Sequence, residues 1–243
     1  MNIFDDLVAE QDRLEAILDG FDNAQWNAPS VAAGWSVADV ILHLAQTEEA
    51  VVWSAAPDAG PGMWSTSASS TDDAAEAMVQ LERASGKEVF ERWKIARRAA
   101  VDALRAADPQ RLLNWAAAPL KPKTLATTRL AEHWAHGLDV TEPFGIPFPD
   151  TARLQHIAWL GHATLPYAFK LEGDEPHEIY CELEAPDGDT WRFGPPDADS
   201  TVTGSAGAFC RVGARRLTPE ASGLVARGPH ADTALRILRN YAA

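Results

Sequence analysis

Hydrophobic side chains recur every three to four residues along residues 3–141, which is the spacing of amphipathic helices. Ile3–Leu18 places most of its large apolar side chains on one side, and Gly20 follows as a helix-ending residue. A second helix is predicted to begin after Ser36, because Ser36 is a good N-cap and Asp39 stands at the capping-box position. This helix is expected to run to about Ala55.

Helical composition resumes after a loop at 56–70 that is rich in proline, glycine and serine. The segment 71–107 predicts one long helix with a bend near Gly86. A fourth helix is expected at about Thr124–Thr141, ending before Pro143. Four helices of this kind pack most simply as an antiparallel bundle, with the second and fourth facing each other across the core.

The pattern changes to a period of two residues after Pro149. Apolar and polar residues alternate along 177–184, and a Pro-Asp-Gly turn at 186–188 leads into a returning strand at 190–193. Further elements are predicted as strands at 201–203 and 224–225 and as helices at 154–164, 204–217 and 229–241. The predicted fold class is therefore α+β, with a helical bundle at 1–146 and a small α+β domain at 147–243.

The composition of the chain argues against several classes of protein. Hydrophobic residues make up 46% of the 243 positions, enough for a sizeable core. No apolar run approaches 18 residues and no basic leader is present, so neither a membrane span nor a signal peptide is expected. Two cysteines do not form a disulfide framework, which favours the cytoplasm. A formal charge of −14 argues against nucleic acid as a partner.

Three side chains of two predicted helices suggest a metal site. Glu132 and His136 are four residues apart, so both project from one face of the fourth helix. His43 adjoins the apolar stripe of the second helix, where its ring nitrogens need a partner. Zinc accepts both ligand types, and three protein ligands leave a fourth position open. This spacing is only weakly specific for a metal site. Glu132 and His136 could instead be a solvated pair on the surface, and His43 could have a buried hydroxyl or carboxylate as its partner.

Two segments also resemble a known family. The first is Trp35-Ser36-Val37-x-Asp39-Val40-x-x-His43-Leu44, and the second is Arg129-Leu130-x-Glu132-x-x-x-His136-x-x-Asp139. Together they resemble the N-terminal metal-binding domain of the mycothiol-dependent maleylpyruvate isomerases, which belong to the DinB-like four-helix bundles. The resemblance covers about Ile3–Gly145. The second half of the chain is similar, less strongly, to the sterol-carrier-like domain of those isomerases.

Carried over by position, the resemblance implies that His43, Glu132 and His136 are ligands of zinc or another divalent metal. Asp139, one turn beyond His136, would support the ligands or brace the helix, and a plain solvent contact is its alternative. His133 is a rival ligand, but it lies on an adjacent helical face and could replace Glu132 only if the helix were rotated.

The family's chemistry implies a thiol cosubstrate, mycothiol or a similar low-molecular-weight thiol. Zinc with an open position can hold a thiol as the nucleophilic thiolate. The thiolate adds to an electron-poor double bond of a small electrophile, the bond rotates, and expulsion of the thiol leaves the isomer. If the thiol is retained, the same site is an S-transferase.

Family isomerases also recognise anions with an arginine of the second domain. Arg215 and Arg216 are the nearest matches here, and Arg211 is an alternative. The family's apolar run before that arginine is replaced by Cys210-Arg211-Val212-Gly213, which argues against maleylpyruvate itself as the substrate. Adjacent arginines near a helix end also serve the helix dipole without binding a ligand.

Two other functions remain open from the residues alone. The chain could be a non-catalytic binder of an apolar ligand, or a zinc hydrolase with Glu48 or Glu49 as the base. Cys181 and Cys210 are interpreted as structural, since one falls on the apolar face of a strand and the other in mid-helix. A monomer or small homo-oligomer is expected.

Overall fold

A computed structural model of the chain describes residues 2–60, 70–116 and 118–240. The chain divides into two compact units, Met1–Phe148 and Pro149–Tyr241, called unit 1 and unit 2 below. The middle of the loop predicted at 56–70 lies outside the described residues. Across the described ranges, no helix is both long enough and apolar enough to span a bilayer.

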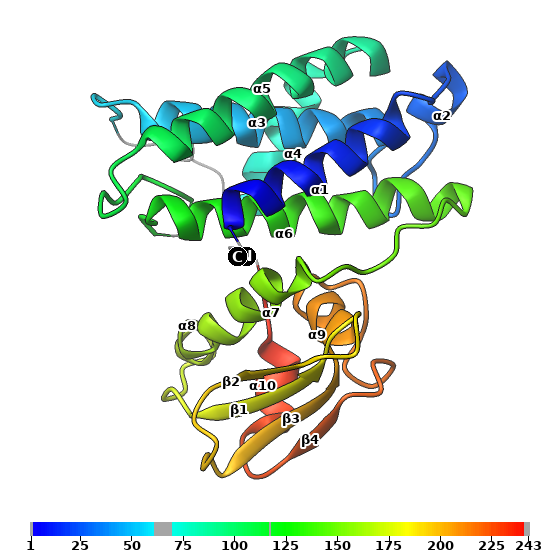
Figure 1. Cartoon of the computed structure of the whole chain (residues 1–243). Helices are drawn as coiled ribbons and strands as arrows, with labels where there is room; N and C mark the ends of the chain where they lie inside the picture. Colours follow the sequence, from blue (N-terminus) through cyan, green and yellow to red (C-terminus); the bar gives the residue numbers. More distant parts are fainter. Residues whose placement is uncertain (1, 61–69, 117, 241–243) are drawn as a thin grey trace. The chain divides into compact units, whose positions relative to one another are not determined.

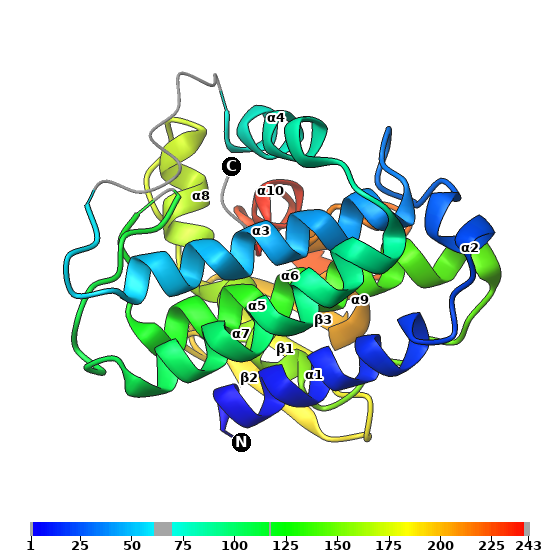
Figure 2. The same ribbon diagram turned by 90° about the horizontal axis from the view of Figure 1, so that it is seen from above.

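Unit 1 is built on four long helices that lie side by side (Figures 1 and 2). Two of them run in one direction and two in the other: α1 and α6 against α3 and α5. Their bounds are Ile3–Leu18 for α1, Val37–Ala55 for α3, Gly86–Ala106 for α5 and Pro122–Thr141 for α6. The described residues of unit 1 also form the helices α2 (Asn23–Asn27) and α4 (Thr71–Glu82) and the 3-10 turn η1 (Glu142–Phe144). This is the predicted four-helix bundle.

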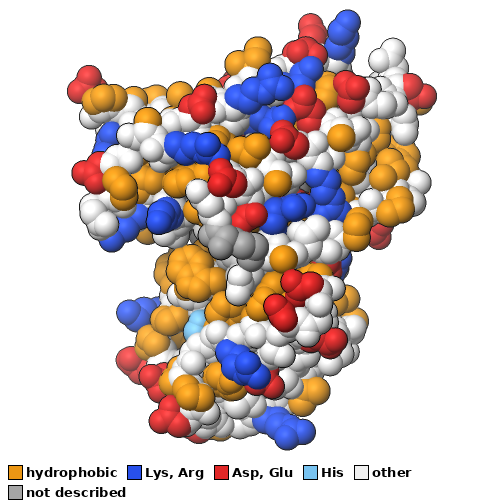
Figure 3. Space-filling model, in the orientation of Figure 1, with side chains coloured by type: hydrophobic (Ala, Val, Ile, Leu, Met, Phe, Trp, Pro, Cys, Tyr) orange, Lys and Arg blue, Asp and Glu red, His pale blue; other side chains and the backbone are white. Residues whose placement is uncertain are grey.

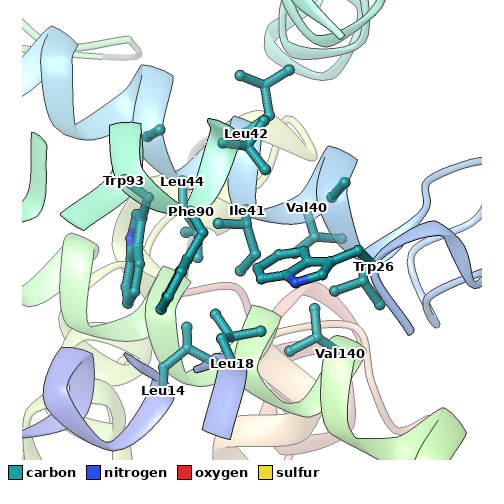
Figure 4. Close-up of a cluster of buried hydrophobic side chains, with 14 of the residues drawn as sticks. Leu14, Leu18, Trp26, Val40, Ile41, Leu42, Leu44, Phe90, Trp93 and Val140 are labelled. Atoms are coloured by element: carbon teal, nitrogen blue, oxygen red, sulfur yellow. The ribbon is translucent and has the colours of Figure 1, made fainter. Parts of the chain in front are cut away.

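The apolar stripes of the four long helices meet in one core (Figure 4). Burying a large aliphatic or aromatic side chain contributes about 1.5–3 kcal/mol, so this cluster is the main stabilising element of unit 1. Its larger members come from every long helix and from α2: Leu14, Leu18, Trp26, Val40, Ile41, Leu42, Leu44, Phe90, Trp93 and Val140.

The prediction of a single helix over 71–107 is wrong, because a non-helical segment separates α4 from α5. Ser85 is an N-cap whose Oγ accepts a hydrogen bond from the Glu88 backbone N–H at 3.4 Å, while the Glu88 carboxylate accepts one from the Ser85 backbone N–H at 3.1 Å. This capping box begins a new helix. Gly86 follows at once, and a side chain there would collide with Trp26.

Acidic and basic side chains alternate over the face of unit 1 that Figure 3 shows. Among the ion pairs of this unit, Arg92 contacts Glu49 and Glu82 at 2.7 Å each, and Arg105 contacts Asp5 at 2.6 Å. Exposed pairs contribute about 0–1 kcal/mol each. The apolar core therefore carries more of the stability than the mixed surface does.

Unit 2 is a four-stranded mixed sheet with helices, as the period-two pattern predicted. The strands β1 (Ile179–Glu184), β2 (Thr190–Phe193), β3 (Ser200–Ser205) and β4 (Val225–Arg227) lie in the order β2-β1-β3-β4. β1 is antiparallel to β2 and parallel to β3, and β3 is antiparallel to β4. The helices are α7 (Leu154–Ala163), α8 (Leu165–Leu171), α9 (Ala206–Gly213) and α10 (Ala231–Ile237). The α+β fold class is confirmed.

The helix predicted at 204–217 is shorter than expected, because α9 ends at Gly213. Arg215 follows with φ of 60°, in the left-handed region that glycine normally occupies. The Arg216 backbone N–H donates to the Arg211 carbonyl at 2.9 Å, and the Arg215 N–H donates to the Val212 carbonyl at 3.1 Å. This Schellman arrangement satisfies the last carbonyls of α9 and stops the helix. The last helix, predicted to reach Tyr241, likewise ends early, at Ile237.

Candidate functional site

The helix that carries His43 is fixed at its first turn. Ser36 caps α3 and exchanges hydrogen bonds with Asp39, whose carboxylate accepts from the Ser36 backbone N–H at 2.9 Å. The Arg83 guanidinium also donates to Asp39, at 2.8 and 3.2 Å. Burial alone would raise the pKa of Asp39, but these hydrogen bonds outweigh it and hold the pKa below its ordinary value. His43 lies one turn further along.

The other two predicted ligands lie on α6. This helix begins with Pro122 in its first turn, where a missing N–H costs nothing. Glu132 and His136 follow one turn apart on the same face, with Glu132 Oε2 3.4 Å from His136 Nε2.

The structure brings His43, Glu132 and His136 together. Their ligand atoms all lie within 4.8 Å of one another, and His43 Nε2 is 3.7 Å from Glu132 Oε2. The side chains keep 12%, 23% and 11% of their surface exposed, in that order. The cluster therefore borders solvent instead of being sealed in the core.

The donor set and its spacing fit a divalent metal. Zinc bonds to imidazole nitrogen and carboxylate oxygen are about 2.0–2.2 Å long, so two ligand atoms of a tetrahedral site lie roughly 3.3–3.5 Å apart. The contacts of 3.4 and 3.7 Å from Glu132 are close to that spacing. Three such ligands leave room for a fourth from outside the protein.

Asp139 contacts the cluster directly through His136. Its Oδ2 lies 2.9 Å from His136 Nδ1, and Asp139 is only 1% exposed. In the neutral ring, the Nδ1 proton is donated to this carboxylate and the Nε2 atom that faces Glu132 carries the lone pair. Burial lowers the pKa of His136, but the hydrogen bonds to Asp139 and Glu132 outweigh burial and raise it. The structure thus brings Asp139 into direct hydrogen-bond contact with His136.

The charge states of the other two predicted ligands, His43 and Glu132, also suit metal binding. Burial lowers the pKa of His43, which keeps its ring neutral near pH 7. Burial would raise the pKa of Glu132, but hydrogen bonds to His136 and His43 hold that pKa well below its ordinary value. A neutral imidazole and an ionised carboxylate are the forms that bind metals.

Trp35 is a residue of the site to which the sequence assigned no role. Its ring lies 5.1 Å from the His43 ring and 6.4 Å from the His136 ring, centre to centre, and its Nε1–H donates to Glu76. The half-buried indole therefore forms one wall of the cluster. Its place at the start of the motif that contains His43 is the signal in the sequence that could have identified it.

His133, the rival ligand, is turned away from the cluster. It is fully buried, its Nε2 accepts a hydrogen bond from Trp93 Nε1–H at 3.1 Å, and its Nδ1 donates to the Arg129 carbonyl at 2.8 Å. Burial holds the pKa of His133 well below its ordinary value, so this ring is neutral. Both ring nitrogens are engaged, and neither is available to a metal.

The carboxylates that a hydrolase would need as a base are both engaged in ion pairs. Glu48 is fully buried and accepts from Arg129 Nε at 3.0 Å. Glu49 accepts two hydrogen bonds of 2.7 Å from Arg92. Burial raises the pKa of Glu48, and Arg129 opposes that shift.

The candidate anion-binding arginines lie in unit 2. Arg215 is exposed and donates to the Arg236 carbonyl at 3.1 Å, while Arg216 donates to the Ala214 carbonyl at 2.6 Å. Arg211 is held in an ion pair with Asp150, with contacts of 2.6 and 3.0 Å. An arginine already paired with a carboxylate is a poor anion receptor, which makes Arg211 a weaker candidate.

Both cysteines are buried. Burial raises the pKa of the Cys181 thiol to about 12 and also raises that of Cys210. Thiols in this state are unreactive near neutral pH, as expected of structural cysteines.

Comparisons with known proteins agree with the fold and the motifs. The family profile described as the mycothiol maleylpyruvate isomerase N-terminal domain matches residues 7–141. Two relatives are 36% identical over 244 residues, which is 98% of this chain and 94% of each relative. They are the uncharacterized proteins MT0041 and Rv0036c of Mycobacterium tuberculosis, from strains CDC 1551 / Oshkosh and ATCC 25618 / H37Rv.

Two solved structures share the fold across 93% of this chain and 95% of their own length. The crystal structure of the mycothiol-dependent maleylpyruvate isomerase gives a TM-score of 0.62 at 16% identity, and a histidine-to-alanine mutant gives 0.64 at 14%. At such identities the likeness concerns the fold alone. The family profile covers more than half of the 243 residues and the relatives span nearly all of them, so the chain belongs to the mycothiol maleylpyruvate isomerase N-terminal domain family.

Proposed function

We propose that this protein is a metal-dependent enzyme that uses mycothiol or a similar low-molecular-weight thiol to isomerise, or to transfer the thiol to, a small electrophile. The observation that carries the proposal is the convergence of His43, Glu132 and His136, with ligand atoms within 4.8 Å, in a chain of the isomerase family. A divalent metal held by these residues would supply a Lewis acid that favours the thiolate form of a thiol beside it.

The residues of the cluster prepare the site before any ligand arrives. In the neutral form of His136, Asp139 keeps the ring proton on Nδ1 and leaves the Nε2 lone pair for a metal, while Glu132 stays ionised without having to release a proton. Trp35 lies beside the two imidazoles, where its indole would limit the access of water from that side. Arg215 or Arg216 would bind the carboxylate of an anionic substrate.

The proposed reaction is balanced without a further cofactor. The thiolate adds to one carbon of an electron-poor double bond, and the π electrons move onto the adjacent carbonyl as an enolate. Rotation about the new single bond, followed by return of the electrons and expulsion of the thiolate, regenerates the double bond in the isomeric form. In S-transfer, a proton from water quenches the enolate instead and the thioether is the product.

The decisive experiment compares wild-type protein with His43→Ala and with His177→Ala, a control histidine of unit 2. Metal content is measured by elemental analysis. Turnover of maleylpyruvate-like and other activated alkenes is measured with and without mycothiol.

We expect one divalent ion per chain and thiol-dependent turnover in the wild type and in the control. His43→Ala should lose both while keeping its helical circular dichroism. Equal turnover in the absence of thiol would show the thiol mechanism to be wrong and favour a hydrolase. Bound metal without turnover of any alkene would favour a non-catalytic binder.

A further inference from the structure

A buried ionic network joins α3 to α6 next to the cluster. Arg129 of α6 is 2% exposed and Glu48 of α3 is fully buried, and Arg129 Nε donates to Glu48 Oε1 at 3.0 Å. A second nitrogen of the same guanidinium, Nη2, donates to Thr47 Oγ1 at 2.7 Å. One planar group therefore holds two neighbouring residues of α3 at once.

Both ends of this network lead to predicted metal ligands. Thr47 Oγ1, which accepts from Arg129, donates its own proton to the backbone carbonyl of His43 at 2.8 Å. On α6, Arg129 lies three residues before Glu132, about one helical turn away. The guanidinium is thus tied to α3 one turn after His43 and to α6 one turn before Glu132.

The position of Arg129 is itself restrained from a third helix. The Arg129 carbonyl accepts from His133 Nδ1, and His133 Nε2 accepts in turn from Trp93 of α5. Both side chains are fully buried, so the surrounding core restricts their movement. The turn of α6 that carries the Arg129 side chain is therefore held in place by contacts with α5.

We propose that Arg129, Glu48 and Thr47 are positioning residues, a brace that sets the distance between His43 and the Glu132–His136 pair before the metal binds. The inference rests on the metal site of the proposed function. His43 stands alone on α3 while its two partners share α6, so its separation from them depends on how the two helices pack. Fork-shaped contacts of a buried arginine fix such packing more tightly than apolar contacts that can slide.

Stability alone does not account for the brace. Burying two opposite charges costs desolvation free energy, and apolar residues of similar volume often stabilise a core as well or better. A bundle that needed only cohesion could have used leucine and methionine at these places. The brace is explained if the site needs its ligands prearranged, because outer contacts of metal ligands typically change metal affinity about 10–100-fold.

The test uses Thr47→Val, which keeps the shape of the side chain but removes the hydroxyl that links Arg129 to His43. Thr47→Ser restores the hydroxyl. Thr127→Val is the matched control, because Thr127 is a buried threonine of α6 that donates a similar intrahelical hydrogen bond, to the Lys123 carbonyl at 3.0 Å. Each full-length variant is titrated with Zn²⁺ and Co²⁺, and the visible absorption of bound Co²⁺ reports the geometry of its ligands.

We expect Thr47→Val to bind Zn²⁺ about 10-fold or more weakly and to shift the Co²⁺ spectrum. Thr47→Ser and Thr127→Val should match the wild type in both respects. Unchanged affinity and spectrum in Thr47→Val would overturn the brace and leave the proposed function standing. Wild-type protein that binds neither ion would overturn the brace and the metal site together.

A second variant keeps the inference testable if Thr47→Val is too unstable to titrate. The double change Arg129→Met and Glu48→Leu removes both buried charges at once and preserves side-chain volume. We expect this variant to fold, by circular dichroism, and to bind Zn²⁺ at least 10-fold more weakly. A folded double variant with wild-type affinity would contradict the proposal.

Discussion

Replacing Asp139 with asparagine removes one charge beside His136 and leaves the shape of the side chain unchanged. In the wild type, Asp139 Oδ2 accepts the proton of His136 Nδ1 across 2.9 Å in a place that is 1% exposed. An asparagine can turn its NH₂ towards Nδ1 and donate instead of accept. The imidazole proton would then move to Nε2, the atom that faces Glu132 at 3.4 Å.

The size of the effect follows from this geometry. Carboxylates that orient a metal-bound histidine typically contribute 10–100-fold to metal affinity, or about 1.4–2.7 kcal/mol. Because Asp139 is nearly inaccessible to water, little of that contribution is lost to solvent screening. We therefore expect Asp139→Asn to weaken Zn²⁺ binding by 10–100-fold, measured by competition with a chromogenic chelator.

The pH dependence gives a second signature. Asp139 helps to raise the pKa of His136, so in the wild type protons compete with the metal as the pH falls through that raised value. Asparagine lowers the pKa of His136, and less proton competition remains in the variant. The difference between the two affinities should shrink towards acidic pH. Equal affinities at pH 8, or a gap that widens in acid, would refute the role given to Asp139.

Two further predictions concern other parts of the chain. Asp39→Asn should lower the free energy of unfolding by about 1–2 kcal/mol at pH 7, since it weakens the α3 cap and the contact with Arg83. The pKa of Asp39 is held below its ordinary 3.8, so this contribution is present above that value and lost as the pH falls. Urea melts at pH 7 and pH 3 check both statements, and a constant deficit would contradict them. Arg216→Ala should raise KM for an anionic substrate about 10-fold with unchanged metal content, because one charged hydrogen bond is worth roughly 1.5 kcal/mol; unaltered steady-state kinetics would exclude Arg216 as the anion contact.

The main elements were predictable because their signals are local. Ser36 and Asp39 mark the start of α3, Pro143 marks the end of α6, and alternation along 177–184 marks β1. The break inside 71–107 also has a local signal, the pair Ser85 and Glu88, but good helix formers on both sides conceal it. The short helix α2 was missed for a similar reason. Asp22 and Gln25 form its capping box inside a segment that otherwise has loop composition.

The site was only partly predictable, because some of its geometry is set within one helix and the rest by how two helices pack. The 3.6-residue period alone places Glu132 and His136 on one face. Where His43 lies relative to them is decided by how α3 and α6 pack, and one sequence does not encode that distance in any short pattern. Arg129 shows the limit: the sequence places it at the start of a family motif, but only the folded chain reveals that its side chain is buried against Glu48.

The partial exposure of the three predicted ligands has a consequence for which ion the protein carries. Side chains that retain 11–23% of their surface can be reached by water and by small chelators, so a bound ion can exchange with the surrounding pool. Two imidazoles and one carboxylate also accept iron, cobalt, nickel and copper as well as zinc. The identity of the ion would then follow the supply in the cell or growth medium as much as the preference of the ligands, and protein purified from different media would carry different metals.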